Sequence, residues 1–169
     1  MADEIVNKVA NSKLINIDLE DFIPKGRRKI IHLSDWLFEG IILKEVDFRN
    51  KIAEHDWKQY QDSFVLIQPA EDAVVPNWAY LLLTVKLTDI AQKIAVGTLQ
   101  ELEDILLLES IEKIDYSIYK EKQIIIKGCS NVVISNNAYS LLIQKLKPIV
   151  KSLMFGEACS NVPLYKQRN

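Results

Sequence analysis

The sequence predicts a mixed protein of the α/β or α+β class, with a mainly parallel sheet, helices on its faces, and a small β-hairpin region at the N-terminus. Two observations predict this class. From residue 63 onward, short aliphatic runs alternate with segments of helical periodicity, which favours βαβ units. Before residue 60, two strand-like runs flank a Pro-Lys-Gly turn signal, which indicates a hairpin.

Local patterns predict each element in order. Leu14–Asp18 and Lys29–Leu33 read as the two N-terminal strands, and a helix is expected over Phe48–His55. The later elements are expected as strands over 63–67, 93–96, 123–127 and 148–155, and as helices over 74–90, 99–113 and 136–147. No internal repeat is expected.

Particular residues support these helices. Thr98 and Glu101 form a capping box, in which each side chain satisfies the other residue's free backbone N–H. Ser135 is a suitable N-cap for the helix that follows it. The 74–90 helix is apolar nearly all round, including Leu81 and Val85, so it is expected to be deeply buried.

Length and composition predict one cytoplasmic domain over residues 1–169, with a β-rich part at 1–60 and a βαβ core at 61–169. The formal net charge of −2 gives no electrostatic reason to expect nucleic acid as a partner. The acidic start lacks the features of a signal peptide, and no apolar run reaches the length of a membrane span. No membrane partner is therefore expected.

The two cysteines lie in matching tripeptides, Cys129-Ser130-Asn131 and Cys159-Ser160-Asn161. Each follows an apolar run and a glycine. If both runs are parallel strands of one sheet, both thiols emerge at the edge where such sheets place their ligands. The segments after the other strands, including Asp72, are expected at this edge as well.

Five residues are candidate metal ligands on this hypothesis. They are Cys129, Cys159, His55, Asp72 and Glu157. A thiolate is a metal ligand, of zinc among others, so a metal ion is the cofactor expected if these residues form a binding site. Two cysteines do not complete a site of four thiolates, which a homodimer would supply. The alternative is that both cysteines are buried and structural in a non-catalytic interaction module, because free cysteine is often a core residue.

The sequence leaves catalysis open. There is no Ser-His-Asp pattern and no phosphate-binding glycine motif. A thiol enzyme with Cys129 as nucleophile and His55 or Asp72 as base is a third hypothesis. His55 and Asp56 are interpreted as a feature of a helix C-terminus. The tryptophans and tyrosines, Trp36, Trp57 and Tyr60 among them, are interpreted as core-packing residues.

Several motifs resemble an uncharacterised bacterial family, domain-of-unknown-function family 2480. They are Asp35-Trp36-Leu37-Phe38, Asp47-Phe48-Arg49, His55-Asp56-Trp57, Pro76-Asn77-Trp78-Ala79-Tyr80, Lys127-Gly128-Cys129-Ser130 and Lys151-Ser152-Leu153-Met154-Phe155-Gly156-Glu157. The resemblance covers essentially the whole chain. It implies a role beside iron–sulfur cluster assembly, with assembly proteins as partners and Cys129 and Cys159 as ligands or sulfur acceptors. Iron or an iron–sulfur cluster is the cofactor that this role implies.

Overall fold

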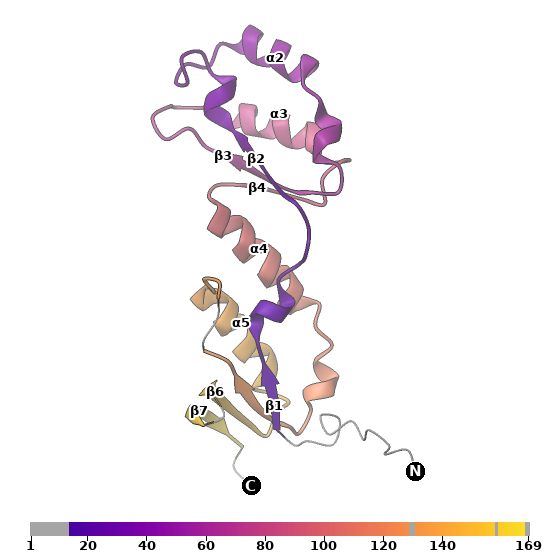
Figure 1. The fold of residues 1–169 in the computed structure, drawn as a ribbon, viewed down its shortest axis with the longest axis vertical. Coiled ribbons are helices and arrows are strands. Elements are labelled where there is room, and N and C mark those ends of the chain that lie inside the picture. The colour runs from indigo at the N-terminus through magenta and orange to yellow at the C-terminus, as the bar shows by residue number, and fades with distance from the viewer. Residues whose placement is uncertain (1–13, 129–130, 158, 168–169) are drawn as a thin grey trace, which may run out of the picture. The chain divides into compact units, whose positions relative to one another are not determined.

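The computed structural model describes residues 14–128, 131–157 and 159–167, and the chain divides into two compact units. Of the described residues, unit 1 contains 14–23, 106–128, 131–157 and 159–167, and unit 2 contains 24–105. The mixed α/β class is confirmed (Figure 1). That the chain is a single domain stays a prediction. None of the helices in the described part of the chain is long and apolar enough to cross a membrane.

Unit 2 is a parallel sheet of three strands in the order β2-β3-β4, with helices packed on it. Its elements are β2 (Arg28–His32), η2 (Leu33–Trp36), α2 (Glu45–Glu54), η3 (Trp57–Tyr60), β3 (Phe64–Gln68), α3 (Asn77–Leu87) and β4 (Lys93–Val96). The middle strand β3 is apolar at four successive positions, all buried, as expected for a strand covered on both faces. The edge strand β2 is more exposed.

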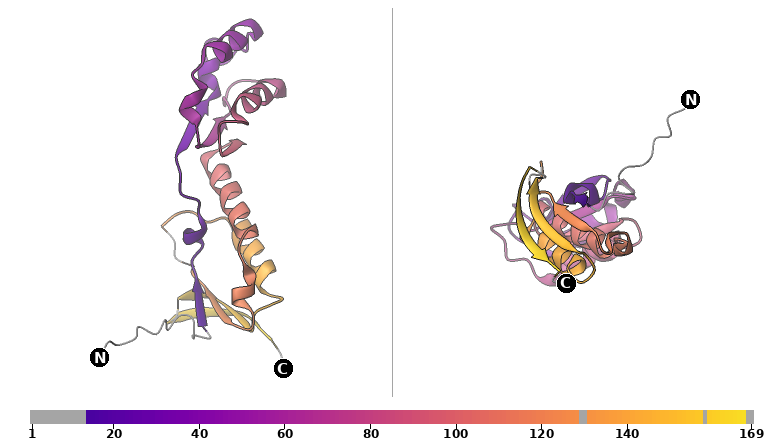
Figure 2. Two further views of the ribbon diagram at one scale, coloured as in Figure 1. Left: turned by 90° about the vertical axis from the view of Figure 1, so that its right-hand side faces the viewer. Right: turned by 90° about the horizontal axis from the view of Figure 1, so that it is seen from below.

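Unit 1 has a sheet of four strands in the order β1-β5-β6-β7, of which the first three are parallel and β7 is antiparallel. Its elements are β1 (Leu14–Ile17), η1 (Leu19–Phe22), η4 (Tyr116–Tyr119), β5 (Gln123–Ile126), α5 (Asn136–Leu146), β6 (Ser152–Glu157) and β7 (Ser160–Lys166). Helix α4 (Leu99–Glu112) begins in unit 2 and ends in unit 1. Within unit 1, α5 lies beside the end of α4 (Figure 2), where Lys145 pairs with Glu112.

The two units repeat one arrangement of elements, which the sequence analysis did not expect. Residues 56–97 of unit 2 match residues 115–156 of unit 1 without a gap, a constant shift of 59 positions from Asp56 to Asp115. Strand β2 matches β1 at a shift of 14 positions, because Ile31 pairs beside Ile67 as Ile17 pairs beside Ile126. The sheet orders β2-β3-β4 and β1-β5-β6 therefore correspond strand by strand.

Backbone details follow the same shift. Asp62 and Glu121 both adopt positive φ (54° and 58°), and each is the turn residue before a middle strand. Their N–H groups donate to corresponding carbonyls, Asp62 to Ile90 at 3.0 Å and Glu121 to Ile149 at 2.9 Å. At the same shift, Phe48 and Ile52 of α2 correspond to Leu107 and Ile111 of α4. Every residue of the unit 2 core except Trp36 then has its counterpart in the unit 1 core. We conclude that the chain contains two copies of one structural module.

Three sequence-based expectations need correction. The N-terminal strands are present, but β1 and β2 join different sheets and do not form a hairpin. The later strands do not form one sheet, since β3 and β4 belong to unit 2 and β5 and β6 to unit 1. In both cases each strand pairs within its own copy of the module. Helix α3 is not buried all round, because Leu81 is 62% exposed and Val85 is 67% exposed.

Candidate functional site

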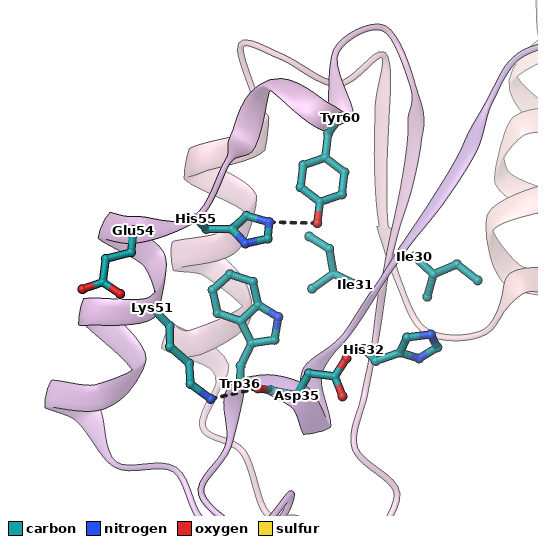
Figure 3. A pocket seen from close by; sticks show the side chains of 9 residues that line it. All are labelled: Ile30, Ile31, His32, Asp35, Trp36, Lys51, Glu54, His55 and Tyr60. Atoms are coloured by element: carbon teal, nitrogen blue, oxygen red, sulfur yellow. Dashed lines mark hydrogen bonds between the residues drawn. The ribbon is translucent and has the colours of Figure 1, made fainter.

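Unit 2 contains a cavity of about 390 Å³ between the edge strand β2 and the segment that joins α2 to η3 (Figure 3). Nine residues line it: Ile30, Ile31, His32, Asp35, Trp36, Lys51, Glu54, His55 and Tyr60. The volume is within the range of small-molecule sites, and the lining combines aromatic walls with a few polar groups, as such sites do. We call this cavity the His55 pocket.

Local structure places His55 and Tyr60 together. Helix α2 ends at Glu54, and His55 leaves it in an extended conformation as the C-cap. Asp56 then caps the next helical turn by accepting a hydrogen bond from the Lys58 N–H at 3.1 Å. This turn carries Tyr60 back, so that its hydroxyl lies 3.0 Å from His55 Nε2. The sequence interpretation of His55 and Asp56 as a helix C-terminal feature agrees with this geometry.

His55 Nε2 lies within hydrogen-bond distance of two side chains. The Tyr60 hydroxyl is 3.0 Å away and the Gln59 Nε2 is 3.2 Å away. The Gln59 amide is itself held in place, because its Nε2 also donates to the Asp56 carbonyl at 2.9 Å. The other ring nitrogen, Nδ1, lies on the Trp36 side of the imidazole (Figure 3).

Aromatic rings enclose the imidazole. The ring centroids of Trp36 and Trp57 lie 4.9 and 4.8 Å from that of His55, and the Tyr60 ring stacks on it at 5.6 Å. This burial lowers the pKa of His55 below its ordinary 6.5, and the nearby Asp56 carboxylate opposes the shift. Burial also raises the pKa of Tyr60. At neutral pH the pocket thus holds a neutral imidazole that can accept or donate a proton.

Charged side chains surround the opening of the pocket. The Lys51 ammonium donates to the Asp35 backbone carbonyl at 2.8 Å, which ties α2 to η2. The carboxylates of Asp35 and Glu54 complete the lining (Figure 3). Sequence reasoning assigned Trp36 and Tyr60 to core packing, and both are indeed buried. Their role in lining the pocket follows only from the fold.

Unit 1 contains a cavity in the corresponding place, but its lining is different. Its residues are Phe22, Ser110, Lys113, Ile114, Asp115, Ile118 and Tyr119. Tyr119 corresponds to Tyr60, and Phe22 corresponds to Trp36. Ile114 stands where unit 2 has His55. The structural tyrosine is therefore present in both copies, whereas the imidazole occurs only in unit 2.

The five predicted site residues are divided between the two units, and that they form one site stays a prediction. His55 and Asp72 belong to unit 2, and Glu157 and Cys159 belong to unit 1. Cys129 lies outside the described residues. The described residues contain no group of three or more His, Cys, Asp and Glu side chains arranged to hold a metal ion. Cys159 is a free thiol and is exposed, so the alternative of a buried structural cysteine is wrong for this residue.

One premise of the thiol hypothesis agrees with the structure. Strands β5 and β6 are parallel neighbours, with Ile126 beside Phe155. The chain segments that carry the two cysteines therefore leave the same edge of the unit 1 sheet. Glu157 is the last residue of β6, and Cys159 lies in the turn to β7.

The fold and the pocket define a mixed α/β protein of two repeated units, one of which carries a histidine-containing cavity. The chain belongs to the family described as "protein of unknown function (DUF2480)", whose family model matches residues 3–167. Comparison with curated proteins and with solved structures gave no significant match.

Proposed function

We propose that this protein binds a small organic molecule in the His55 pocket, and that the His55 imidazole exchanges a hydrogen bond or a proton with it. One observation carries the proposal. The two units have cavities in corresponding places, and only the cavity of unit 2 has an imidazole paired with the tyrosine that both units share, Tyr60 in unit 2. In unit 1 this position is occupied by Ile114. A side chain that only packs against its neighbours therefore does not need to be a histidine.

The repeat supplies the test variant. His55→Ile gives unit 2 the residue that unit 1 has at this position. The variant is therefore expected to fold. Leu81→Ser is the matched control, because it also introduces the unit 1 residue, Ser140, but on the exposed face of α3 outside the pocket. Fragment binding to the full chain is followed by the NMR signals of the His55 ring and of the Trp36 indole.

The expected result is that fragments shift both signals in the wild type and in Leu81→Ser, and bind His55→Ile at least about tenfold more weakly. Equal fragment affinity of the wild type and His55→Ile would show that the imidazole does not take part in binding. If no fragment shifts the His55 and Trp36 signals of the wild type, the pocket is not a small-molecule site.

A second, narrower candidate function is the iron–sulfur role that the family resemblance implies. Two observations favour it: the common sheet edge from which the two cysteine segments emerge, and the exposure of the Cys159 thiol. Elemental analysis of protein purified without oxygen tests it. Bound iron that is lost in Cys159→Ser is the expected result. The absence of iron and sulfide from the wild type would contradict this function.

A further inference from the structure

The His55 pocket borders the outer edge of β2, which is an edge strand of the unit 2 sheet. Among the described residues, no strand pairs with β2 on the side away from β3. Three successive residues of β2, namely Ile30, Ile31 and His32, belong to the pocket lining. An open strand edge presents unpaired backbone N–H and C=O groups, with which another chain can pair. The pocket and this edge are therefore neighbouring parts of one surface.

The hydrogen bonds between β2 and β3 show which backbone groups of β2 face outward. The Arg27 carbonyl accepts from the Phe64 N–H at 2.8 Å, and the two strands pair in parallel. Alternate residues of a strand bond to the same neighbour, so Arg27 and Ile31 bond to β3, and the N–H and C=O of Ile30 point away from it. Ile30 is 39% exposed, and no described residue outside the sheet bonds to its backbone.

The side chains of β2 alternate between the two faces of the sheet. Ile31 points toward Tyr60 and His55, whereas Ile30 and His32 lie on the other side of the strand (Figure 3). Residues that lie opposite each other in paired strands direct their side chains to the same face. A residue paired beside Ile31 on the open edge would therefore direct its side chain into the His55 pocket.

Unit 1 has a corresponding edge, but its cavity does not reach that edge. Strand β1 also lies at the edge of its sheet, and Asn16 of β1 corresponds to Ile30. None of the residues that line the unit 1 cavity belongs to β1. The open edge is thus common to both copies of the module. The placement of a cavity beside it distinguishes unit 2.

Lys29 places a positive charge beside the open edge of β2. It lies two positions before Ile31, so its side chain is on the same face of the strand. Lys25, Arg27 and Arg28, which precede it, are also basic. A residue paired beside Lys29 lies two positions from the residue that enters the pocket. A carboxylate at that position would form a favourable cross-strand pair with the Lys29 ammonium.

We propose that the ligand of the His55 pocket is a short extended segment of a partner protein that pairs with the outer edge of β2. The backbone of the segment exchanges hydrogen bonds with the N–H and C=O of Ile30. The side chain beside Ile31 enters the pocket and packs against Trp36, and an acidic residue two positions away lies beside Lys29. In this mode of recognition, backbone pairing gives affinity and the pocket gives specificity. The inference rests on the proposed function and adds the class of the ligand.

The probe is the peptide acetyl-Glu-Thr-Tyr-Thr-Glu-amide, whose symmetric sequence offers an acidic residue to Lys29 in either strand direction. It is titrated into the full chain while the NMR signals of the His55 ring, the Trp36 indole and the Ile30 amide are followed. The peptide is expected to shift all three signals and to slow hydrogen exchange of the Ile30 amide. It should bind about tenfold or more tightly than p-cresol, which has the tyrosine ring alone.

Methylation of the peptide nitrogens is the decisive change. Successive N–H groups of a strand point to opposite edges, so only alternate ones pair with β2. One variant peptide is methylated on the tyrosine nitrogen, and the other is methylated on both threonine nitrogens. One of the two is expected to lose about tenfold or more in affinity, and the other to lose clearly less, according to the strand direction. Equal affinities of all three peptides, or equal losses in both variants, would overturn the inference.

Two variants of the protein test the same contacts from the other side. Ile30→Pro removes the outward N–H and retains the groups that bond to β3, as proline does on edge strands. Asn16→Pro is the matched control, since it makes the same change at the corresponding position of β1. Affinity for the peptide is expected to fall about tenfold or more in Ile30→Pro and to stay unchanged in Asn16→Pro. Unchanged affinity in Ile30→Pro would contradict the proposed pairing.

The contribution of Lys29 is tested by the charge of the peptide. The same peptide with glutamine at both ends should bind the wild type about threefold more weakly, and this difference should be smaller in Lys29→Gln. An equal difference in the wild type and in Lys29→Gln would overturn the placement of the acidic residue.

Other failures point to different errors. If p-cresol shifts the His55 and Trp36 signals and the peptide binds no more tightly, the peptide inference is wrong and the small-molecule pocket stands. If p-cresol, the peptide and the fragments all leave these signals unchanged, the proposed function itself is wrong. Sedimentation of the free chain tests another occupant. A dimer that the peptide dissociates would assign the edge to a second copy of the chain and overturn the partner protein.

Discussion

At the scale of single residues, His55 differs in chemistry from its counterpart in the other unit, Ile114. Its imidazole is hydrogen-bonded to Tyr60 and enclosed by the rings of Trp36 and Trp57. These contacts desolvate the ring and favour its neutral form. A charged imidazole would have to be stabilised among aromatic faces, with Asp56 as a nearby negative charge. The protein therefore pays a free-energy cost when His55 is protonated in the folded state.

This cost predicts a pH dependence of stability. The pKa of His55 is lower in the folded chain than the ordinary 6.5, so the unfolded state takes up the proton first as the pH falls. The free energy of unfolding should accordingly fall as the pH is lowered through about 6.5. Urea unfolding between pH 8 and pH 5.5 measures this slope. His55→Ile should remove most of it.

The other histidine provides the control for this experiment. His32 is exposed at the end of β2. His32→Ala should therefore retain the slope. If the free energy of unfolding of His55→Ile keeps the wild-type pH dependence, then the His55 imidazole is not its cause.

At the scale of elements, the paired helices α3 and α5 show how one module presents two different surfaces. Their buried sides match, with Leu83 at the position of Leu142 in the respective cores. Their outer sides do not match. Leu81 and Val85 are exposed on α3, where α5 has a serine and a glutamine. The near-uniform apolar character of α3 thus does not arise from burial within unit 2.

Replacing these two exposed residues should leave unit 2 folded. In the double variant Leu81→Ser with Val85→Gln, α3 receives the residues of α5, and the free energy of unfolding should change by less than about 1 kcal/mol. Chemical denaturation measures the change. Leu83→Ala on the buried side of the same helix is the contrasting variant, with an expected loss of about 2–5 kcal/mol. A similar loss in both would mean that the outer face is packed after all.

The N-terminus of α4 is held by the capping box that the sequence predicts. The Glu101 carboxylate accepts from the Thr98 N–H at 2.6 Å, and the Thr98 hydroxyl accepts from the Glu101 N–H at 3.3 Å. The hydrogen bonds from Thr98 lower the pKa of Glu101. This contribution to stability is present above the ordinary carboxyl pKa and is lost as the pH falls through the lower folded value.

Removing the cap should destabilise the chain modestly. Thr98→Ala deletes the hydroxyl that accepts from Glu101 and should lower the free energy of unfolding by about 1 kcal/mol at pH 7. Thr98→Ser retains the hydroxyl and should be close to the wild type. Thermal or urea unfolding of the two variants gives the comparison. Equal stability of the alanine and serine variants would show that the cap contributes nothing measurable.

At the scale of the whole molecule, the sequence of unit 2 is inserted into the sequence of unit 1. The first strand of unit 1, β1, precedes all of unit 2 in the sequence, and the remaining strands of unit 1 follow it. Each unit has its own buried cluster. The three parallel strands of each unit follow the same order, and long-range pairing of β1 with β5 replaces the hairpin that the local turn signal suggests.

Separate cores predict separate responses to mutation. Leu83→Ala should speed amide hydrogen exchange in β2, β3 and β4, and Leu142→Ala should do so in β5 and β6. These two residues correspond in the repeat and are both fully buried, so each variant is the control for the other. Hydrogen exchange read by mass spectrometry resolves the two groups of peptides. Faster exchange throughout the chain in either variant would indicate a single cooperative unit.

The sequence alone predicted most of the elements, because capping residues and hydrophobic periodicity act over a few neighbouring residues. The helix expected over 136–147 is observed as Asn136–Leu146, and the strand expected over 123–127 as Gln123–Ile126. His55 was a candidate on sequence grounds, but as a metal ligand with cysteines. Its actual neighbours, Trp36 and Tyr60, were assigned to packing, since sequence spacing does not show which buried rings border a cavity.

The tertiary structure decided which strands pair and which side chains share a cavity. Strand pairing depends on contacts between distant residues, such as Ile17 beside Ile126, which no local pattern specifies. The repeat was present in the sequence at a shift of 59 positions, as in Asp56 and Asp115, yet many of its exposed residues have diverged. The buried positions, where packing restricts the choice of side chain, preserve it most clearly. What the sequence determined by itself was therefore the set of local elements, and the tertiary structure determined the two sheets and the lining of the His55 pocket.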